Sequence, residues 1–425
     1  MPMQASLAAR LERELPAIVE HYGTPFHLYD EAGIRATTDR LLAAFEGTPF
    51  REYYAVKALP NPAILRLLRE RGCGFECASI AELKLSRMCG ASGEDIFFTS
   101  NNTLHEEFDR ALELDAIVNV DDVTMLAKLA RAPSLLSFRF NPGGELVGEG
   151  MIGNPLEAKF GVRRDQLVAA YAAAQALGAR RFGLHAMVAS NRLDVEPLLA
   201  TLAMLLELEQ ELHDQLGIAC EFVNFGGGLG IPYRPGEPEL DVEALGAGAV
   251  RLLDAHAELT GRRPALFVES GRYVTGPHGV LVTTVANRMS KWREYAGVDA
   301  GMAALMRPAM YPGAYHHVTL LGDDGERPLE RVDVVGGLCE NNDKFAIQRE
   351  LPALREGDVL CIHDTGAHGI AMGFNYNGKL KPQELLLRAD GGVELIRRAE
   401  EVERDYFGTL RFEADVLAPQ GVGSA

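Results

Sequence analysis

Positive charge is scarce in this 425-residue chain, which has 42 Lys and Arg against 60 Asp and Glu and a formal net charge of −18. A nucleic-acid-binding surface needs concentrated basic residues to displace counterions from phosphates. The sequence contains no Lys/Arg cluster of that kind, so we expect no nucleic-acid partner. Hydrophobic residues make up 47% of the chain, which is enough for a large core and excludes a disordered or fibrous protein.

Cysteine and long hydrophobic runs are also sparse. Six scattered cysteines do not form a disulfide framework and are typical of a cytoplasmic protein. Charges at helical spacing interrupt the most apolar segment, 198–216, so it falls short of a membrane span. The first twenty residues predict an amphipathic helix with Leu7, Leu11, Leu15 and Ile18 on one face, and no signal peptide. We therefore expect a cytoplasmic protein without a membrane partner.

Short apolar runs alternate with amphipathic helical patterns over the first two thirds of the chain. Strand and helix repeated eight times predict a closed parallel (β/α)8 barrel, although an open doubly wound sheet would give a similar pattern. We favour the barrel. Its predicted strands are 53–57, 74–78, 96–99, 116–120, 135–140, 182–188, 220–225 and 265–269.

The residue pattern changes after about residue 275, where strand-like runs are separated by Gly, Pro and Asp. This pattern predicts a second, mostly antiparallel β domain. The early strand 27–30 is assigned to the same domain, because the strand count of the barrel is already complete. The predicted barrel domain is 33–275, and the predicted β domain combines 1–32 with 276–425.

The predicted carboxyl ends of the barrel strands carry distinctive residues, and barrels of this kind perform their chemistry there. Lys57 ends the first strand and Glu76 lies in the second. The seventh strand opens into three glycines, 226–228, and the eighth ends at Glu269, followed by Ser-Gly-Arg272. Glycine N–H groups and an arginine after the last two strands predict an anion site suited to a phosphate.

Lys57 has two interpretations. Most single lysines simply reach solvent, but a lysine partly desolvated at a barrel mouth would have a lowered pKa and an amine suited to Schiff-base chemistry. An aldehyde cofactor with a phosphate would use both Lys57 and the anion site. Glu269 beside a pyridine nitrogen would keep that ring protonated. Together these features point to pyridoxal 5′-phosphate (PLP).

Sequence blocks in a fixed order over nearly the whole chain resemble the fold-type III PLP-dependent decarboxylases, most closely the diaminopimelate decarboxylases. The resemblance implies a carbon–carbon lyase with an N-terminal barrel, a C-terminal β domain and the alanine racemase-like fold. It also implies a homodimer whose active sites are shared between subunits. The blocks include YYAVKA (53–58), FECASIAEL (75–83), NFGGGLGIPY (224–233), ESGRYVTGPHG (269–279), RPAMY (307–311) and GGLCENND (336–343).

The same resemblance implies roles for individual residues. Lys57 would form the Schiff base with PLP, and Cys339 of the partner would donate the proton that replaces carbon dioxide. Without this resemblance, Cys339 would be interpreted as a small buried hydrophobe. The residues implied near the cofactor are Lys57, Glu76, Ser190, Gly227, Gly228, Glu269, Gly271, Arg272 and His368.

The substrate contacts implied by the resemblance lie mainly in the β domain. Arg307 and Tyr311 would hold the distal carboxylate of the substrate, whereas a lone arginine in an acidic chain more often forms a surface ion pair. Glu340 would lie near the distal ammonium group, and Arg272 would reach the substrate as well as the phosphate.

Two positions depart from the family pattern. Met187 replaces the histidine that stacks on the cofactor, and methionine can pack on a ring but cannot carry charge. His368 replaces the tyrosine of a Gly-Ala-Tyr sequence, and an imidazole can still hydrogen-bond to a phosphate. These replacements indicate a divergent branch and affect the choice of substrate more than the choice of cofactor.

Four functions are compatible with the sequence. The first is decarboxylation of meso-diaminopimelate to L-lysine, and the second is the same chemistry on another amino acid or a carrier-bound aminoacyl group. A racemase is less favoured, because it would usually pair the pyridine nitrogen with arginine. An inactive PLP-binding homologue is less favoured too, because it would be expected to lose Lys57 or Cys339.

Two further patterns have simpler interpretations. The glycine-rich segment 143–153 resembles a nucleotide-binding loop by composition, but it does not join the first strand and helix of a dinucleotide unit. We interpret it as a mobile active-site loop. The histidines of the β domain fit no strong zinc spacing, so no metal site is predicted. They are His316, His317, His363 and His368.

Overall fold

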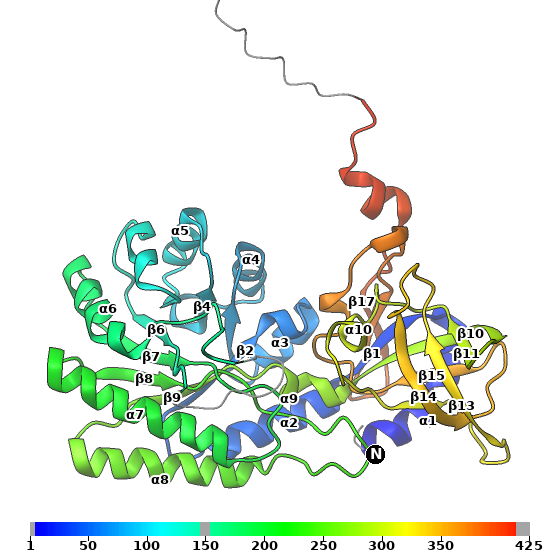
Figure 1. Ribbon diagram of the computed structural model, residues 1–425, viewed down its shortest axis with the longest axis horizontal. Helices are drawn as coiled ribbons and strands as arrows, with labels where there is room; N and C mark the ends of the chain where they lie inside the picture. The colour runs from blue at the N-terminus through cyan, green and yellow to red at the C-terminus, as the bar shows by residue number, and fades with distance from the viewer. Residues whose placement is uncertain (1–4, 145–153, 414–425) are drawn as a thin grey trace, which may run out of the picture.

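The computed structural model describes residues 5–144 and 154–413 of the chain. A barrel and a sheet domain lie side by side and meet at the mouth of the barrel (Figure 1). Most of the glycine-rich segment 143–153 lies outside the described residues. Within the described part, no helix is long and apolar enough to cross a membrane.

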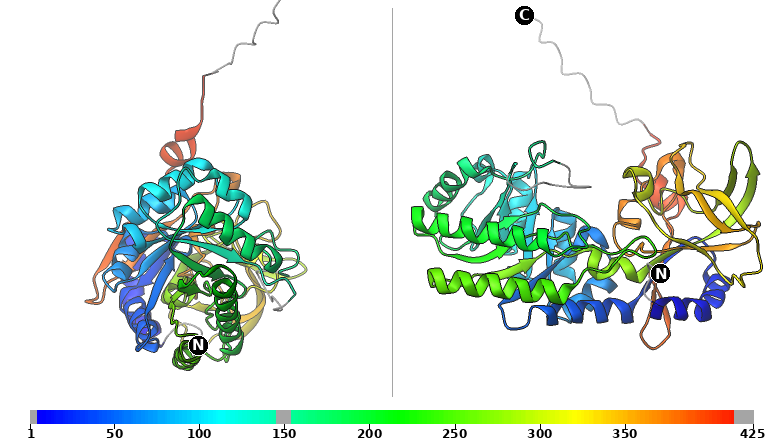
Figure 2. Two further views of the ribbon diagram at one scale, coloured as in Figure 1. Left: turned by 90° about the vertical axis from the view of Figure 1, so that its left-hand side faces the viewer. Right: turned by 60° about the horizontal axis from the view of Figure 1, so that its bottom comes forward.

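Eight parallel strands close the barrel in chain order, which confirms the predicted topology. Strand β2 pairs with both β3 and β9, and helices surround the strands (Figure 2, left). The strands are β2 (Phe50–Ala55), β3 (Gly74–Cys77), β4 (Ile96–Ser100), β5 (Ile117–Val120), β6 (Leu136–Phe140), β7 (Phe182–Ala186), β8 (Cys220–Asn224) and β9 (Ala265–Val268).

The barrel helices begin and end at residues that satisfy free backbone groups. Ser79 caps α4 by accepting a hydrogen bond from Glu82 N, and Asp241 caps α8 by accepting one from Ala244 N. Helices α6, α7 and α8 end at glycines in the left-handed region, where other residues are strained. The helices are α2 (Glu31–Ala44), α3 (Pro62–Arg69), α4 (Ile80–Met88), α5 (His105–Glu113), α6 (Arg164–Leu177), α7 (Glu196–Leu216) and α8 (Val242–Thr260).

Over the described residues, the sheet domain contains nine strands that are mostly antiparallel, with parallel pairs β1–β16 and β11–β13. The early strand β1 lies between β10 and β16, which confirms its assignment to this domain. The strands are β1 (Phe26–Asp30), β10 (Gly279–Ser290), β11 (Glu294–Val298), β12 (Val318–Leu320), β13 (Leu329–Val335), β14 (Lys344–Pro352), β15 (Val359–Ile362), β16 (Gln383–Leu387) and β17 (Val393–Arg397).

The two ends of the described chain take different positions. Helix α1 (Ala5–Tyr22) buries the predicted apolar face of Leu7, Leu11, Leu15 and Ile18 in one hydrophobic cluster with strands β1, β10 and β16. After β17, two short helical turns, Val402–Tyr406 and Phe407–Thr409, extend away from the body of the molecule (Figure 1).

Short connections hold the barrel mouth against the sheet domain. The chain passes from β9 through the one-turn helix α9 (Arg272–Thr275) almost directly into β10. After β15 the chain returns to the barrel, where the backbone N–H of His368 donates to the carbonyl of Ala58, 2.8 Å away. Residues from both domains therefore face one another across the carboxyl ends of the barrel strands.

The packing of α1 on the sheet predicts how substitutions in this helix change the free energy of unfolding. Leu15→Ala removes a fully buried side chain and should lower the free energy of unfolding by about 2–5 kcal/mol, measured by urea denaturation. Glu12→Ala, on the exposed face of the same helix, should change it by less than about 0.5 kcal/mol. Equal effects of the two substitutions would contradict docking through the leucine face.

Candidate active site

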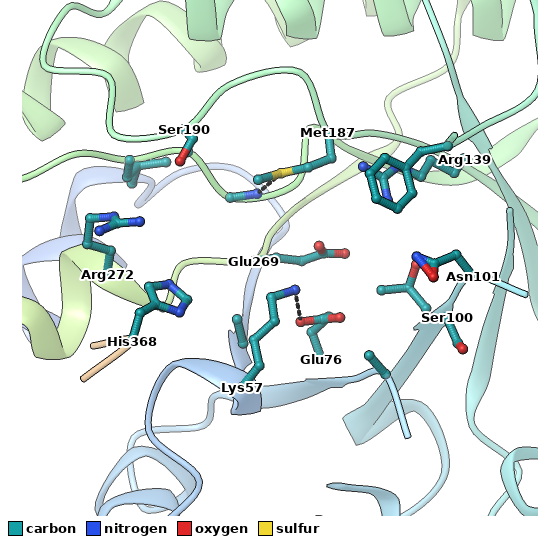
Figure 3. A pocket seen from close by; sticks show the side chains of 18 of the residues that line it. Lys57, Glu76, Ser100, Asn101, Arg139, Met187, Ser190, Glu269, Arg272 and His368 are labelled. Carbon is teal, nitrogen blue, oxygen red and sulfur yellow. Dashed lines mark hydrogen bonds and ion pairs between the residues drawn. The ribbon is translucent and has the colours of Figure 1, made fainter. Parts of the chain in front are cut away.

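A cavity of about 620 Å³ lies at the carboxyl ends of the barrel strands. Its size is typical of a small-molecule site. The barrel supplies most of the wall, and the sheet domain adds Arg307, Tyr311, His368 and Met372. Figure 3 shows the side chains that converge on it.

Lys57 lies in a single 3-10 turn, Val56–Ala58, directly after β2, so the strand ends two residues before the lysine. Its side chain is 54% exposed and its Nζ donates to Glu76 Oε2 at 3.1 Å. Desolvation lowers the pKa of Lys57, but the carboxylates of Glu76 and Glu269 outweigh this effect and the net pKa is raised. The lowered pKa predicted for this lysine is therefore wrong, because the prediction considered burial alone and not the charges of Glu76 and Glu269 close to the amine.

The two carboxylates differ in protonation. Burial raises the pKa of Glu76 to about 7, despite the opposing charge of Lys57. Burial also favours the neutral form of Glu269, but His185, Lys57 and the Asn224 amide outweigh it and lower the pKa. Glu269 accepts a hydrogen bond from Asn224 Nδ2 at 2.9 Å and lies 3.3 Å from His185 Nε2. The result is a buried, ionised carboxylate directly after β9, hydrogen-bonded to the end of β8.

The glycine loop after β8 lies close to neighbouring backbone, and this proximity requires glycine. A Cβ at Gly227 would lie 2.5 Å from Glu269 O, and one at Gly228, with φ +94°, would lie 2.8 Å from Ala189 O. A Cβ at Gly271 would lie 2.6 Å from the Cβ of Ala58. Bare backbone at the cavity wall beside Arg272 is the arrangement expected of a phosphate cradle.

The two positions that depart from the family pattern both line the cavity. The Sδ of Met187 accepts a hydrogen bond from Gly227 N at 3.1 Å, and its side chain lies across the cavity from Lys57 in Figure 3. Burial lowers the pKa of His368 well below its usual value, and Arg272 lowers it further, so the imidazole is neutral. Ser190 also lines the wall, after β7.

Arg307 is held in an unusual environment at the sheet-domain side of the cavity. Arg307 is only 5% exposed, and its guanidinium carbon lies 4.1 Å from the centre of the Tyr233 ring. The Tyr233 hydroxyl accepts a hydrogen bond from Arg272 Nη1 at 2.6 Å, so one tyrosine contacts both arginines. Tyr311 lines the same cavity, next to Arg307.

Cys339 and Glu340 do not line this cavity in their own chain. Cys339 is exposed, and its backbone N–H donates to Asn377 Oδ1 at 2.8 Å. Glu340 lines a separate hollow of about 320 Å³ with Met306 and Phe374, among others. Their predicted role in a partner's site stays a prediction.

Several residues that contact the site were missed by sequence reasoning. Arg139 lies in β6, with its guanidinium carbon 4.4 Å from the centre of the Phe160 ring, and Asn101 follows β4. The strand-end rule, applied to all eight strands, would have found them. It would also have found His185 in β7 and Asn224 at the end of β8. Within the described ranges, no group of three or more His, Cys, Asp and Glu could hold a metal ion.

Comparisons with known proteins agree with this geometry. Residues 31–276 match the family described as the pyridoxal-dependent decarboxylase, pyridoxal binding domain. The chain is 46% identical to Protein TabA of Pseudomonas amygdali pv. tabaci over 99% of both chains. It is 38% identical to the diaminopimelate decarboxylase of Methanothermobacter thermautotrophicus, with 92% of each chain covered. The structure of diaminopimelate decarboxylase from M. jannaschii in co-complex with L-lysine has a TM-score of 0.83 at 30% identity, covering 95% of this chain and 94% of that one.

The residues present fit the cofactor of this family. One cavity combines an accessible lysine amine, a buried ionised carboxylate for a pyridine nitrogen, and a glycine cradle beside Arg272 for a phosphate. The barrel-plus-sheet fold matches the solved decarboxylases over nearly the whole chain. The chain therefore belongs to the pyridoxal-dependent decarboxylases, as a PLP-dependent carboxy-lyase of the diaminopimelate decarboxylase type.

Proposed function

We propose that the enzyme removes carbon dioxide from an α-amino acid that carries a second, distal carboxylate, with meso-diaminopimelate as substrate and L-lysine as product. One observation carries this proposal. Arg307 is a buried guanidinium at the cavity wall, and no Asp or Glu among the described residues forms an ion pair with it. A buried cation without a counterion is costly, so the site favours a ligand that brings a carboxylate.

Asp364, whose charge acts on Arg307, does not fill this role. Burial raises the pKa of Asp364 well above its usual value, despite the nearby Arg307 charge, which favours the neutral form of this carboxyl group. Both of its oxygens are buried without a hydrogen-bond partner in the described part of the chain. The positive charge of Arg307 is therefore available to the cavity. Diaminopimelate, which gives several relatives their name, has such a distal carboxylate.

The residues of the barrel serve the reacting end of the substrate. When bound, PLP supplies an electron sink for the electron pair released as carbon dioxide leaves. We assign its attachment to Lys57, its pyridine nitrogen to Glu269 and its phosphate to the 226–228 loop with Arg272. Glu76 lies 3.1 Å from Lys57 Nζ, and a pKa near neutrality suits it to hold or release a proton at that atom.

We assign protonation of the product to Cys339 of a second subunit. In its own chain this thiol is exposed and lies outside the cavity, as does Glu340. A homodimer that places both residues at the partner's cavity would supply the missing acid and a carboxylate for the distal ammonium. The proposal therefore requires shared active sites.

A different dicarboxylic amino acid is the second candidate. The relative at 46% identity is Protein TabA, whereas the named diaminopimelate decarboxylase is at 38%. Met187 and His368 replace two family residues inside the cavity. A panel of α-amino acids, assayed by release of carbon dioxide, separates these substrates.

The first expectation is that borohydride reduction fixes PLP to Lys57 as a stable secondary amine, detected by peptide mass spectrometry. Lys57 is expected because its Nζ is the amine exposed to the cavity beside Glu76. Lys84→Ala, on the exposed surface of α4, should label normally, whereas Lys57→Ala should not. Labelling of another lysine in the wild-type enzyme would contradict the assignment of PLP attachment to Lys57.

Shared sites predict complementation between two inactive variants. Lys57→Ala and Cys339→Ala subunits should each have little activity alone, but mixed dimers regain one site with both residues intact. The measurement is carbon dioxide release after the subunits are mixed and exchanged, with hybrid formation checked by native mass spectrometry. Hybrids that form and stay inactive would show that each site uses residues of one subunit only.

Arg307→Ala should reduce kcat/KM for meso-diaminopimelate by roughly two to four orders of magnitude. The reason is that an unpaired buried carboxylate costs about 3–5 kcal/mol, and about 1.4 kcal/mol corresponds to one decade. Arg331→Ala, an exposed arginine of β13, is the matched control and should have little effect. PLP absorbance should be unchanged in both variants. Equal losses for substrates with and without a distal carboxylate would make Arg307 structural.

A further inference from the structure

The guanidinium of Arg307 is oriented by a buried histidine that the sequence did not connect with it. His316 is fully buried, and its Nε2 lies 3.2 Å from Arg307 Nη1. On the other side of the ring, His316 Nδ1 lies 2.7 Å from the backbone carbonyl oxygen of His363. These two contacts place the imidazole between the cavity arginine and the end of β15.

The two contacts determine the tautomer of His316. A carbonyl oxygen can only accept a hydrogen bond, so Nδ1 must carry the proton. Arginine has no acceptor, so Nε2 must offer its lone pair to Nη1. A protonated imidazole could not do this. Burial, and after it the charge of Arg307, lower the pKa of His316 to about 3, which keeps the ring neutral.

The remaining contacts of Arg307 hold it without neutralising it. Nη1 also donates to the carbonyl of Tyr315 at 3.4 Å, and the ring of Tyr233 covers one face of the guanidinium. Among the described residues, the hydrogen bonds of this side chain all leave from Nη1. Nε is buried without a hydrogen-bond partner, and no hydrogen bond leaves from Nη2 in the described part of the chain, so we assign Nη2 to a ligand. Arg307 lines both the main cavity and an adjoining hollow of about 410 Å³.

We propose that His316 is a positioning residue that determines selectivity for the distal carboxylate. As a neutral hydrogen-bond acceptor, it fixes the orientation of the Arg307 guanidinium. A carboxylate at this position would orient the arginine equally well, but it would cancel the charge that the substrate needs. The imidazole supplies direction and leaves the full positive charge for the ligand. This inference rests on the proposed function, in which Arg307 binds a distal carboxylate.

Two substitutions separate the acceptor from the rest of the side chain. His316→Gln places an acceptor near the position of Nε2, whereas His316→Asn keeps a donor near Nδ1 and lacks the distal acceptor. The His316→Asn variant should raise KM for meso-diaminopimelate about tenfold with kcat changed less than about twofold, and the His316→Gln variant should stay within about threefold of wild type. Equal losses in both variants, or a loss confined to kcat, would overturn the positioning role.

Binding of pimelate to the holoenzyme tests the same point without turnover. Pimelate has the carbon skeleton and both carboxylates of diaminopimelate but no amino group. Its Kd, measured by calorimetry, should rise about tenfold in the His316→Asn variant and remain near wild type in His316→Gln. An unchanged Kd in His316→Asn, with a raised Kd in Arg307→Ala, would overturn the role of His316 alone. A wild-type enzyme that does not bind pimelate would overturn the carboxylate site itself.

These outcomes distinguish the inference from the proposed function. If diaminopimelate is not decarboxylated but pimelate binding depends on both Arg307 and His316, the substrate is wrong and the positioning role stands. A measurement on the unaltered enzyme covers the case in which the His316→Asn variant does not fold. Nitrogen-15 spectra of histidine-labelled holoenzyme, assigned with His316→Gln, should show the Nδ1–H tautomer at neutral pH. An Nε2–H tautomer or a protonated ring would overturn the proposal.

Discussion

The site depends on the close approach of two backbones at the barrel mouth. A Cβ at Gly366 would lie 1.9 Å from Thr275 O, and one at Gly279 would lie 2.4 Å from Gly366 Cα. Only glycine allows this contact, which brings His368 beside the turn that carries Lys57. The barrel core continues across the junction to Ala367, so the two domains share buried surface. Without that contact, the barrel residues and the sheet-domain arginine would not face one cavity.

Charge is distributed unevenly within this cavity. Glu76 and Glu269 lie beside the lysine amine, while Arg272 and Arg307 lie toward the sheet domain and are connected through Tyr233. In the proposed function, the carboxylates face the reacting amine and the arginines face the anionic groups of the ligand. The two domains contribute unequally: Arg307 comes from the sheet domain, whereas both carboxylates and Arg272 follow or belong to barrel strands, and Arg139 lies in β6. Low local dielectric strengthens both sets of interactions.

Much of this arrangement could be predicted from the sequence, because it depends on local patterns. Alternation of strands and helices predicted the closed barrel, and the strand-end rule found Lys57, Glu269 and Arg272. The pKa direction of Lys57 was not accessible, since it depends on the distances between the amine and two carboxylates from other strands. His316 was equally hidden, because a buried histidine beside an arginine leaves no spacing signal. The roles of Cys339 and Glu340 depend on a second chain and stay predictions.

The order of the strands also has a consequence for how the chain folds. Strand β1 pairs with β10 on one side and with β16 on the other, so Phe26 meets Val282 and Gln383. The whole barrel is inserted between the first strand of the sheet and its neighbours. During synthesis, β1 leaves the ribosome with no pairing partner until the barrel is complete, and its second partner follows near the end of the chain. Helix α1, whose leucines pack on the same strands, gains its complete binding surface only when β16 has been made, so the amino terminus cannot be fully docked before then.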